Sequence, residues 1–246
     1  MPNNEHFHES YRQLEERMKA LAEVEGDVFL PNLTPEGPVE YVLICMEPSL
    51  GQWAHSPEDA RSKVEAGFRN FLFSIEDFIL HYCARHYLCE AGEHYHITDL
   101  SKGAMLVDHA AHARNQRYDR WYSLLQEELD LVAPSNAAIV AVGNAVAQHL
   151  ERRKFQRPFT QVIHYSGQAA QARNMAVAGQ EDNFQAFRDS VSLKEVVATA
   201  HGILSESGIP AHFREETLSR LAKSQLSLSR QKLIFHYKRA FEAIHS

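Results

Sequence analysis

The fold is decided by one stretch of the chain, Tyr41-Val42-Leu43-Ile44-Cys45-Met46-Glu47-Pro48-Ser49-Leu50-Gly51-Gln52-Trp53. Its continuous apolar run breaks at a glutamate, a proline and a glycine within a few residues. A buried parallel strand has this pattern, because helices cover both of its faces and its carboxyl end opens into a loop. The stretch therefore predicts a strand over 39–45 that delivers Glu47 to a loop, and chemistry is expected at that end.

Three further short apolar segments, at 95–98, 137–142 and 159–164, have the flanking turn residues of strands. Helices are indicated between the strands, starting after Ser56, over 74–86, over 118–132 and through His149. Strands that alternate with helices predict an α/β fold of three layers (α/β/α), with a central four-stranded parallel sheet. In such sheets ligands bind at the carboxyl ends of the strands. This rule gathers residues from four distant segments at one edge: Glu47, Asp99, Gly143 and His164.

Helical patterns also precede and follow the predicted sheet. Ser10 and Gln13 have the spacing of a capping box, and apolar residues recur at helical spacing up to Gly26. An N-terminal helix and loop are therefore expected over 1–38, and a helical C-terminal extension over 176–246 with a break at 208–210. The 246 residues and 44% apolar content suit a single domain over 1–246 with a substantial core.

Composition excludes several classes of function. No apolar run approaches the ~20 residues that span a bilayer, and the first residues lack the pattern of a signal peptide. A cytoplasmic monomer without a membrane partner is therefore expected. The net charge is 25 − 32 = −7, so any surface that binds nucleic acid must be local. The segment 211–246 carries a local charge of +4. Its basic helix faces are candidates for contact with the DNA backbone, and the alternative is that these faces are only solvated.

The cysteines and histidines point to no cofactor. Three cysteines without a CxxC pair argue against a disulfide framework or an iron–sulfur site. One stretch is chemically able to bind zinc, but its spacing matches no usual zinc pattern. We therefore expect no metal at the residues of that stretch: His81, Cys83, His86, Cys89, His94 and His96.

Four segments, taken in order, resemble motifs of the uracil-DNA glycosylase superfamily. Residues 45–52, Cys-Met-Glu-Pro-Ser-Leu-Gly-Gln, resemble the first motif, closest to the Gly-Met-Asn-Pro-Gly-Pro-Phe-Gly form of the single-strand-selective branch. Residues 97–102, 128–145 and 163–166, with Arg173 and Asn174 behind the last, resemble the later motifs. The resemblance covers a recognisable core over 39–175 and implies a glycosylase-like domain that acts on DNA, double- or single-stranded, with a flipped base.

The resemblance implies the chemistry of two residues. Family members hydrolyse the N-glycosidic bond of a flipped nucleotide, which needs a carboxylate near C1′ and donors at the base oxygens. Glu47 stands where the family places an Asp or Asn that activates or positions water. His164 matches the histidine that donates to the base O2. The alternative for Glu47 is a glutamate at a strand end that caps a local turn, and the alternative for His164 is a structural histidine.

Two departures from the family pattern suggest the base. Asp99 stands where the family has an asparagine that reads uracil, and an ionised aspartate offers only acceptors. It should favour the exocyclic amine of cytosine, with N3 satisfied only if either partner holds a proton. Ser49 stands where some uracil-specific members carry a tyrosine that blocks pyrimidine C5. Together the two residues suggest a cytosine with a substituent at C5.

The remaining candidates have weaker roles. Met46 lies in the first motif, and an aromatic ring that stacks on the base is expected from Phe71 or Phe68, either of which could instead be core. Lys102 is a candidate phosphate contact. In the segment that follows His164, Gln168 could fill the gap left by the flipped nucleotide. The candidate DNA contacts are Lys102, Ser166, Gln168 and Arg173.

A cell that released ordinary cytosine would damage its own genome, so a cytosine-reading glycosylase must require a mark that the host lacks. Hydroxymethylated or glucosylated cytosine in phage DNA is such a mark, and the expected function is defence against modified phage DNA. The alternatives are uracil repair, with Asp99 protonated and donating to O4, and a non-catalytic domain that binds nucleic acid or protein on the same fold.

Overall fold

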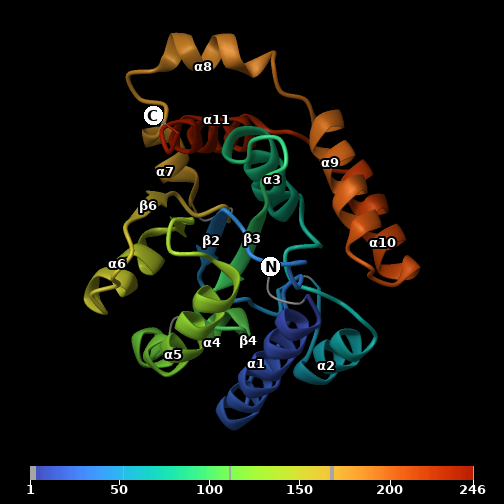
Figure 1. The fold of residues 1–246 in the computed structure, drawn as a ribbon. Coiled ribbons are helices and arrows are strands. Elements are labelled where there is room, and N and C mark those ends of the chain that lie inside the picture. The colour runs from blue at the N-terminus through green and yellow to red at the C-terminus, as the bar shows by residue number, and fades with distance from the viewer. Residues whose placement is uncertain (1–3, 52, 111, 167–168, 246) are drawn as a thin grey trace.

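The computed structural model describes residues 4–51, 53–110, 112–166 and 169–245 of the chain (Figure 1). At its centre is a four-stranded sheet with the order β3-β2-β5-β6, in which all neighbouring strands are parallel. The sequence prediction of an α/β fold around such a sheet is confirmed. The strands are β2 (Tyr41–Cys45), β3 (Tyr95–Asp99), β5 (Ala138–Val142) and β6 (Phe159–Val162).

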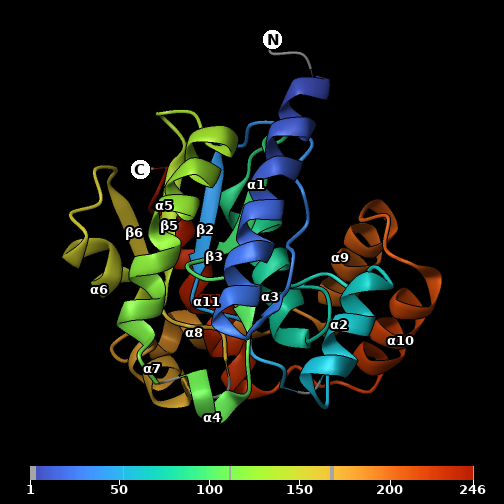
Figure 2. The same cartoon turned by 90° about the horizontal axis from the view of Figure 1, so that it is seen from below.

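Helices cover both faces of the sheet because successive residues of β2 point to opposite sides. Leu43 and Cys45 belong to the core shared with α3 (Ile75–Cys83) and α11 (Leu228–Glu242). Val42 and Ile44 belong to the core shared with α5 (Arg114–Val132) and α6 (Asn144–Arg152). Figure 2 shows α5 in front of the sheet and α11 behind it. This two-sided burial explains why β2 is apolar throughout.

Local capping signals set several helix starts. In α2 (Pro57–Glu65) the Ser56 side chain accepts the Asp59 amide, and in α3 Ser74 and Asp77 form a capping box. The predicted capping box at Ser10 is wrong, because α1 (Asn4–Glu25) begins six residues earlier and runs through that position. Phe7 is buried one turn before Tyr11, so the apolar stripe of α1 continues upstream of Ser10.

A small two-stranded sheet lies outside the main one and was not expected from the sequence. In it β1 (Val28–Phe29) pairs antiparallel with β4 (Gly103–Ala104). A Cβ atom at Gly103 would lie 2.8 Å from Asp27 Oδ2, so a larger residue at this crossing would displace the Asp27 side chain. The pairing ties the chain that follows β3 to the end of α1.

The C-terminal helices share one core with the sheet. Buried residues of α8 (Glu181–Arg188), α9 (Leu193–Glu206) and α11 belong to the cluster that also holds Leu43 and Val140. The Tyr237 hydroxyl of α11 donates to the Ile163 carbonyl at 2.9 Å, just before His164. None of the described helices is long and apolar enough to cross a bilayer. The other elements are α4 (Val107–Ala110), α7 (Ala170–Met175), α10 (Ala211–Ala222) and the π-helix η1 (Ala84–Leu88).

Candidate functional site

The carboxyl ends of the four strands meet at one edge, as the sequence predicts. Cys45 lies beside Asp99 in the register of β2 and β3, and the Gly143 amide donates to the Val162 carbonyl at 2.8 Å. Gly143 has φ +104°, and a Cβ atom there would lie 3.2 Å from the Cβ and Cδ2 atoms of His164. A glycine is therefore required where the ends of β5 and β6 bring His164 against the neighbouring chain.

Asp99 is buried at this edge with its two oxygens in different situations. Its Oδ2 accepts the Asn70 Nδ2–H at 2.7 Å, whereas Oδ1 has no hydrogen-bond partner within the described part of the chain. Burial raises the pKa of Asp99 well above its ordinary value; Lys102 and the Asn70 hydrogen bond oppose this shift, and the negative charges of Glu128 and Glu47 add to it. Burial therefore favours the neutral acid, whose proton would lie on Oδ1 because Oδ2 accepts from Asn70.

Asn70 is held in one orientation by its other contacts. Its Oδ1 accepts the Phe71 amide at 3.0 Å, and its Nδ2 also donates to Asn32 Oδ1 at 3.2 Å. An amide with both donors and its acceptor engaged cannot flip without losing these bonds. Asn70 therefore fixes Oδ2 of Asp99 as an acceptor. No sequence pattern points to Asn70, because the contact depends on the path of the loop between α2 and α3.

The backbone beside Asn70 is strained. Phe71 has φ +60°, a region that non-glycine residues rarely occupy. The Phe71 carbonyl accepts from His81 Nε2 at 3.2 Å, while His81 Nδ1 lies 2.7 Å from the Tyr95 hydroxyl. The Phe71 ring is buried, with its centroid 6.3 Å from that of Tyr165. Strain that surrounding contacts hold in place is typical of functional sites.

The Glu47 side chain is also buried, but one of its partners is a cation. Arg114 approaches Oε1 through Nε at 2.9 Å and Nη2 at 2.8 Å, and the Tyr118 hydroxyl donates to Oε2. An ionised carboxylate offers about four acceptor positions, so these contacts leave capacity on Oε2 for one more donor such as water. Ala113, which precedes Arg114, has φ +48°, a second strained position next to a candidate site residue.

His164 is neutral and has a defined tautomer. Burial lowers its pKa to about 4, and the positive charges of Arg173 and Arg114 act in the same direction. The Ser166 amide donates to Nδ1 at 3.1 Å, so the ring proton resides on Nε2. His164 therefore presents an N–H donor without carrying charge.

Lys102 lies in the interior, which corrects the expectation that it contacts phosphate. Its Nζ donates to Glu128 Oε2 and to Thr98 Oγ1, each at 2.6 Å, and its side chain is 2% exposed. Burial would raise the pKa of Glu128, but Lys102 and His96 outweigh it and lower that pKa to about 2. The ion pair supports the strand that ends at Asp99 and is not available to DNA.

Arg173 supports the loop that carries His164, in place of the predicted DNA contact. It is buried and donates to the carbonyls of Tyr165 and Ser166, the latter at 2.8 Å, and to Ser229 Oγ at 3.1 Å. Ser166 itself is partly exposed beside this loop. Gln168 lies outside the described residues.

Of the two predicted aromatic contacts, Phe71 lies nearer the site. Phe68 stacks on Trp53 with ring centroids 4.7 Å apart and meets Phe213 edge-on at 5.4 Å, which makes it a core residue. Met46 and Ser49 are partly exposed on the loop after β2, on either side of Glu47 in the sequence.

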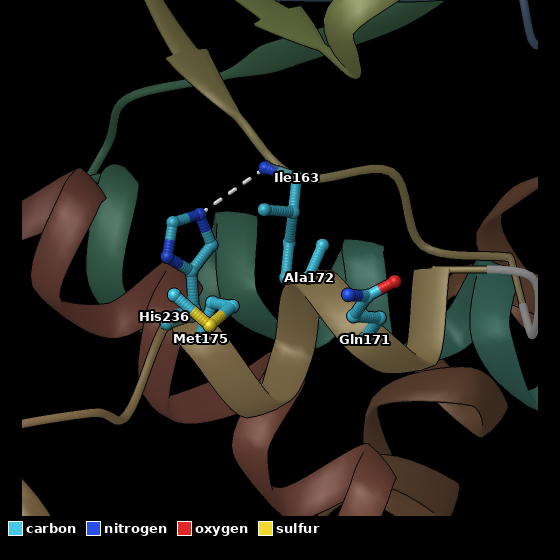
Figure 3. Close-up of a pocket in the computed structure, with 6 residues that line it drawn as sticks. Ile163, Gln171, Ala172, Met175 and His236 are labelled. Atoms are coloured by element: carbon cyan, nitrogen blue, oxygen red, sulfur yellow. Dashed lines mark hydrogen bonds between the residues drawn. The ribbon is translucent and has the colours of Figure 1, made fainter.

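No described group of three or more His, Cys, Asp or Glu side chains has the arrangement of a metal site. Two hollows lie near the sheet edge. One, of about 540 Å³, is lined mainly by apolar atoms of Ile163, Ala172, Met175 and their neighbours; Figure 3 shows the Ile163 amide donating to His236 there. The other, of about 450 Å³, is lined by Arg114 and by polar residues of α5 and α6: Asn115, Gln116 and Gln148.

Comparison of the chain with protein-family models finds no match, and none is found among curated protein sequences or among solved structures. The function therefore has to be argued from the residues at the sheet edge.

Proposed function

We propose that this chain is a DNA glycosylase that hydrolyses the N-glycosidic bond of a flipped pyrimidine, with a 5-modified cytosine as its favoured substrate. One observation carries the proposal: a buried carboxyl group with one oxygen free, a neutral histidine donor and a paired carboxylate come from three strand ends to one edge. The order of motifs that resemble the uracil-DNA glycosylase superfamily supports the same conclusion.

His164 serves the leaving base. As the glycosidic bond breaks, the electron pair moves onto the base, and its O2 gains negative charge. The Nε2–H of His164 donates to that oxygen, and the bond strengthens as charge develops. A neutral donor suits this role because it lies in place before the charge appears and costs no reorganisation.

Glu47 serves the sugar and the water. The sugar becomes positively charged at C1′, and an adjacent carboxylate stabilises this charge. The capacity left on Oε2 positions a water molecule, whose proton passes to the carboxylate as its oxygen attacks C1′. Arg114 and Tyr118 hold the carboxylate in one orientation, which offsets the freedom of the longer glutamate side chain.

Asp99 reads the base as a neutral acid. Its Oδ1–H donates to cytosine N3, and Oδ2 accepts the exocyclic amine beside the Asn70 bond. The proton that cytosine recognition requires thus comes from Asp99. The same proton lets Asp99 donate to O4 of uracil, so uracil excision is the second candidate.

The small side chain of Ser49 leaves room for a substituent at pyrimidine C5. Because release of ordinary cytosine would damage the host genome, the substrate carries a mark that the host lacks. Hydroxymethylated or glucosylated cytosine of phage DNA meets this requirement, and defence against such phage is the biological role we propose.

The test uses matched duplexes that contain uracil, cytosine, 5-hydroxymethylcytosine or its glucosylated form, with alkali-labile abasic sites as the readout. We expect release of modified cytosine by the wild-type protein and none by the Glu47→Ala variant, which should still bind DNA. Release of uracil alone would contradict the cytosine proposal and favour a role in uracil repair. Absence of release from every duplex would leave a binding module on this fold.

A further inference from the structure

Glu128 of α5 lies in the interior beside β3, at the centre of a cluster of polar side chains. Its Oε1 accepts from the Tyr11 hydroxyl of α1 at 3.1 Å and lies 3.0 Å from His96 Nε2. Its Oε2 accepts from Thr98 Oγ1 at 2.8 Å and from Lys102 Nζ at 2.6 Å. Burial opposes its ionisation, but Lys102 and His96 lower its pKa to about 2. Glu128 is therefore an anion, and its carboxylate can only accept hydrogen bonds.

The hydroxyl of Thr98 has a fixed direction in this cluster. Its proton goes to Glu128 Oε2, because an ionised carboxylate has no proton to donate. One lone pair of Thr98 Oγ1 accepts from Lys102 Nζ at 2.6 Å, because an ammonium group has only donors. The lone pair that remains faces Asn32 Nδ2 at 3.3 Å. Asn32 must therefore turn its NH₂ group, and not its oxygen, towards Thr98.

Asn32, in the loop that follows β1, connects Thr98 to Asn70. Its side chain is buried, and its Oδ1 accepts the Asn70 Nδ2–H at 3.2 Å. The Asn70 Nδ2 group also donates to Asp99 Oδ2 at 2.7 Å. Glu128 and Asp99 are thus the two ends of a hydrogen-bond chain in which each bond has one allowed direction.

We propose that Glu128 is a positioning residue for Asp99. Its negative charge sets the direction of every bond along the chain, and the last bond makes Oδ2 of Asp99 an acceptor and leaves Oδ1 as the oxygen that can carry a proton. The use of this arrangement to read a base rests on the proposed function, whereas the direction of the bonds does not. Glu128 acts on the site through three side chains and touches no substrate.

The test cuts the chain at Thr98, because loss of Glu128 would remove the counterion of the buried Lys102 and destabilise the fold. Thr98→Val keeps the shape of the side chain but removes the hydroxyl, so Asn32 loses the acceptor of its NH₂ group. Thr98→Ser keeps the hydroxyl and should behave as the wild type. Thr199→Val removes the hydroxyl of another buried threonine, on α9, and is the matched control.

The Asn70 side-chain amide gives a readout that does not depend on activity. In ¹⁵N-labelled protein its NMR signals are assigned by their loss in Asn70→Ala, and the exchange of its protons with solvent is measured. Exchange should be about tenfold or more faster in Thr98→Val than in the wild type, because Asn32 loses a buried hydrogen bond and no longer holds Asn70. Thr98→Ser and Thr199→Val should stay within about twofold of the wild type.

Base release tests the same chain through the proposed function. Release of modified cytosine should fall several-fold in Thr98→Val and should keep the wild-type rate in Thr98→Ser. If the wild type releases no base but Asn70 exchanges faster in Thr98→Val, the proposed function fails and the positioning role of Glu128 stands.

Three results would overturn the positioning role. Unchanged exchange in Thr98→Val would show that the Phe71 amide alone orients Asn70. Equally fast exchange in Thr199→Val would show a general loosening of the core. Exchange in Thr98→Ser as fast as in Thr98→Val would show that the hydroxyl is not the connecting group.

Discussion

Glu47 and Asp99 are both buried carboxyl groups at the ends of adjacent strands, yet their surroundings are opposite. Glu47 meets the guanidinium of Arg114 and the hydroxyl of Tyr118, whereas Asp99 meets the neutral amide of Asn70. Burial raises the pKa of Asp99 and favours its protonated form, although the bond from Asn70 and the charge of Lys102 oppose this shift. The difference shows how one sheet edge provides both an anion for the sugar and an acid for the base.

Replacement of Glu47 should have the largest effect on base release. In the Glu47→Gln variant the side chain keeps nearly the same shape but loses its charge and basicity, so single-turnover base release should fall by about 10²–10⁴-fold. Binding of the modified duplex, measured by fluorescence anisotropy, should change little. Equal base release by the variant and the wild type would show that Glu47 only orders Arg114 and Tyr118.

Removal of the acid should abolish reading of the base. In Asp99→Leu the side chain keeps a similar size but loses both the Oδ1–H donor and the Oδ2 acceptor, so release of modified cytosine should fall by about 100-fold or more. Asp99→Asn keeps a donor beside the acceptor that Asn70 holds and should retain more of that release. Equal release by Asp99→Leu and the wild type contradicts the role of Asp99 in recognition.

Removal of the group that orients the acid should have a smaller effect. Asn70→Ala frees Oδ2 of Asp99 and releases the strained Phe71 amide, so cytosine release should fall by about tenfold. The preference for cytosine over uracil should narrow as well, which a purely structural role would not produce. Asn183→Ala on the exposed face of α8 serves as the control substitution.

A change of pH should have the smallest effect. Because Asp99 acts as an acid with a raised pKa, cytosine release should decline several-fold as rising pH ionises it. His164, whose pKa is about 4, is already neutral at higher pH and adds no step. The decline should be absent from base release by Asp99→Asn. A flat profile for the wild type would contradict an acidic Asp99.

The sheet and the convergence of its strand ends could be predicted from sequence because both depend on local patterns. The apolar run of β2 and the alternation of strands and helices fix the topology, and the topology brings Asp99 beside Cys45 and His164 beside Gly143. Parallel strands end at the same edge of the sheet, so this convergence can be predicted without knowing any tertiary contact.

The partners of those residues could not be predicted in the same way. Asn70 precedes Phe71, and Arg114 follows Ala113. Phe71 and Ala113 have left-handed backbone conformations that no local sequence pattern predicts. Lys102 looked like a surface residue because its partner Glu128 lies 26 residues further along the chain, on α5. Each contact depends on the position of a loop or a helix face in the folded chain. That position determines whether a charged side chain is exposed or paired.

The protonation state of Asp99 tests the comparison of the two carboxyl groups most directly. Carbon-13 NMR of carboxyl-labelled protein, with the Asp99 signal assigned by its loss in Asp99→Asn, follows that group as the pH is raised. We predict that Asp99 ionises at a higher pH than a solvent-exposed aspartate does. An Asp99 that ionises in the ordinary range of an aspartate would contradict the comparison, because the edge would then carry two anions and no acid to read cytosine N3.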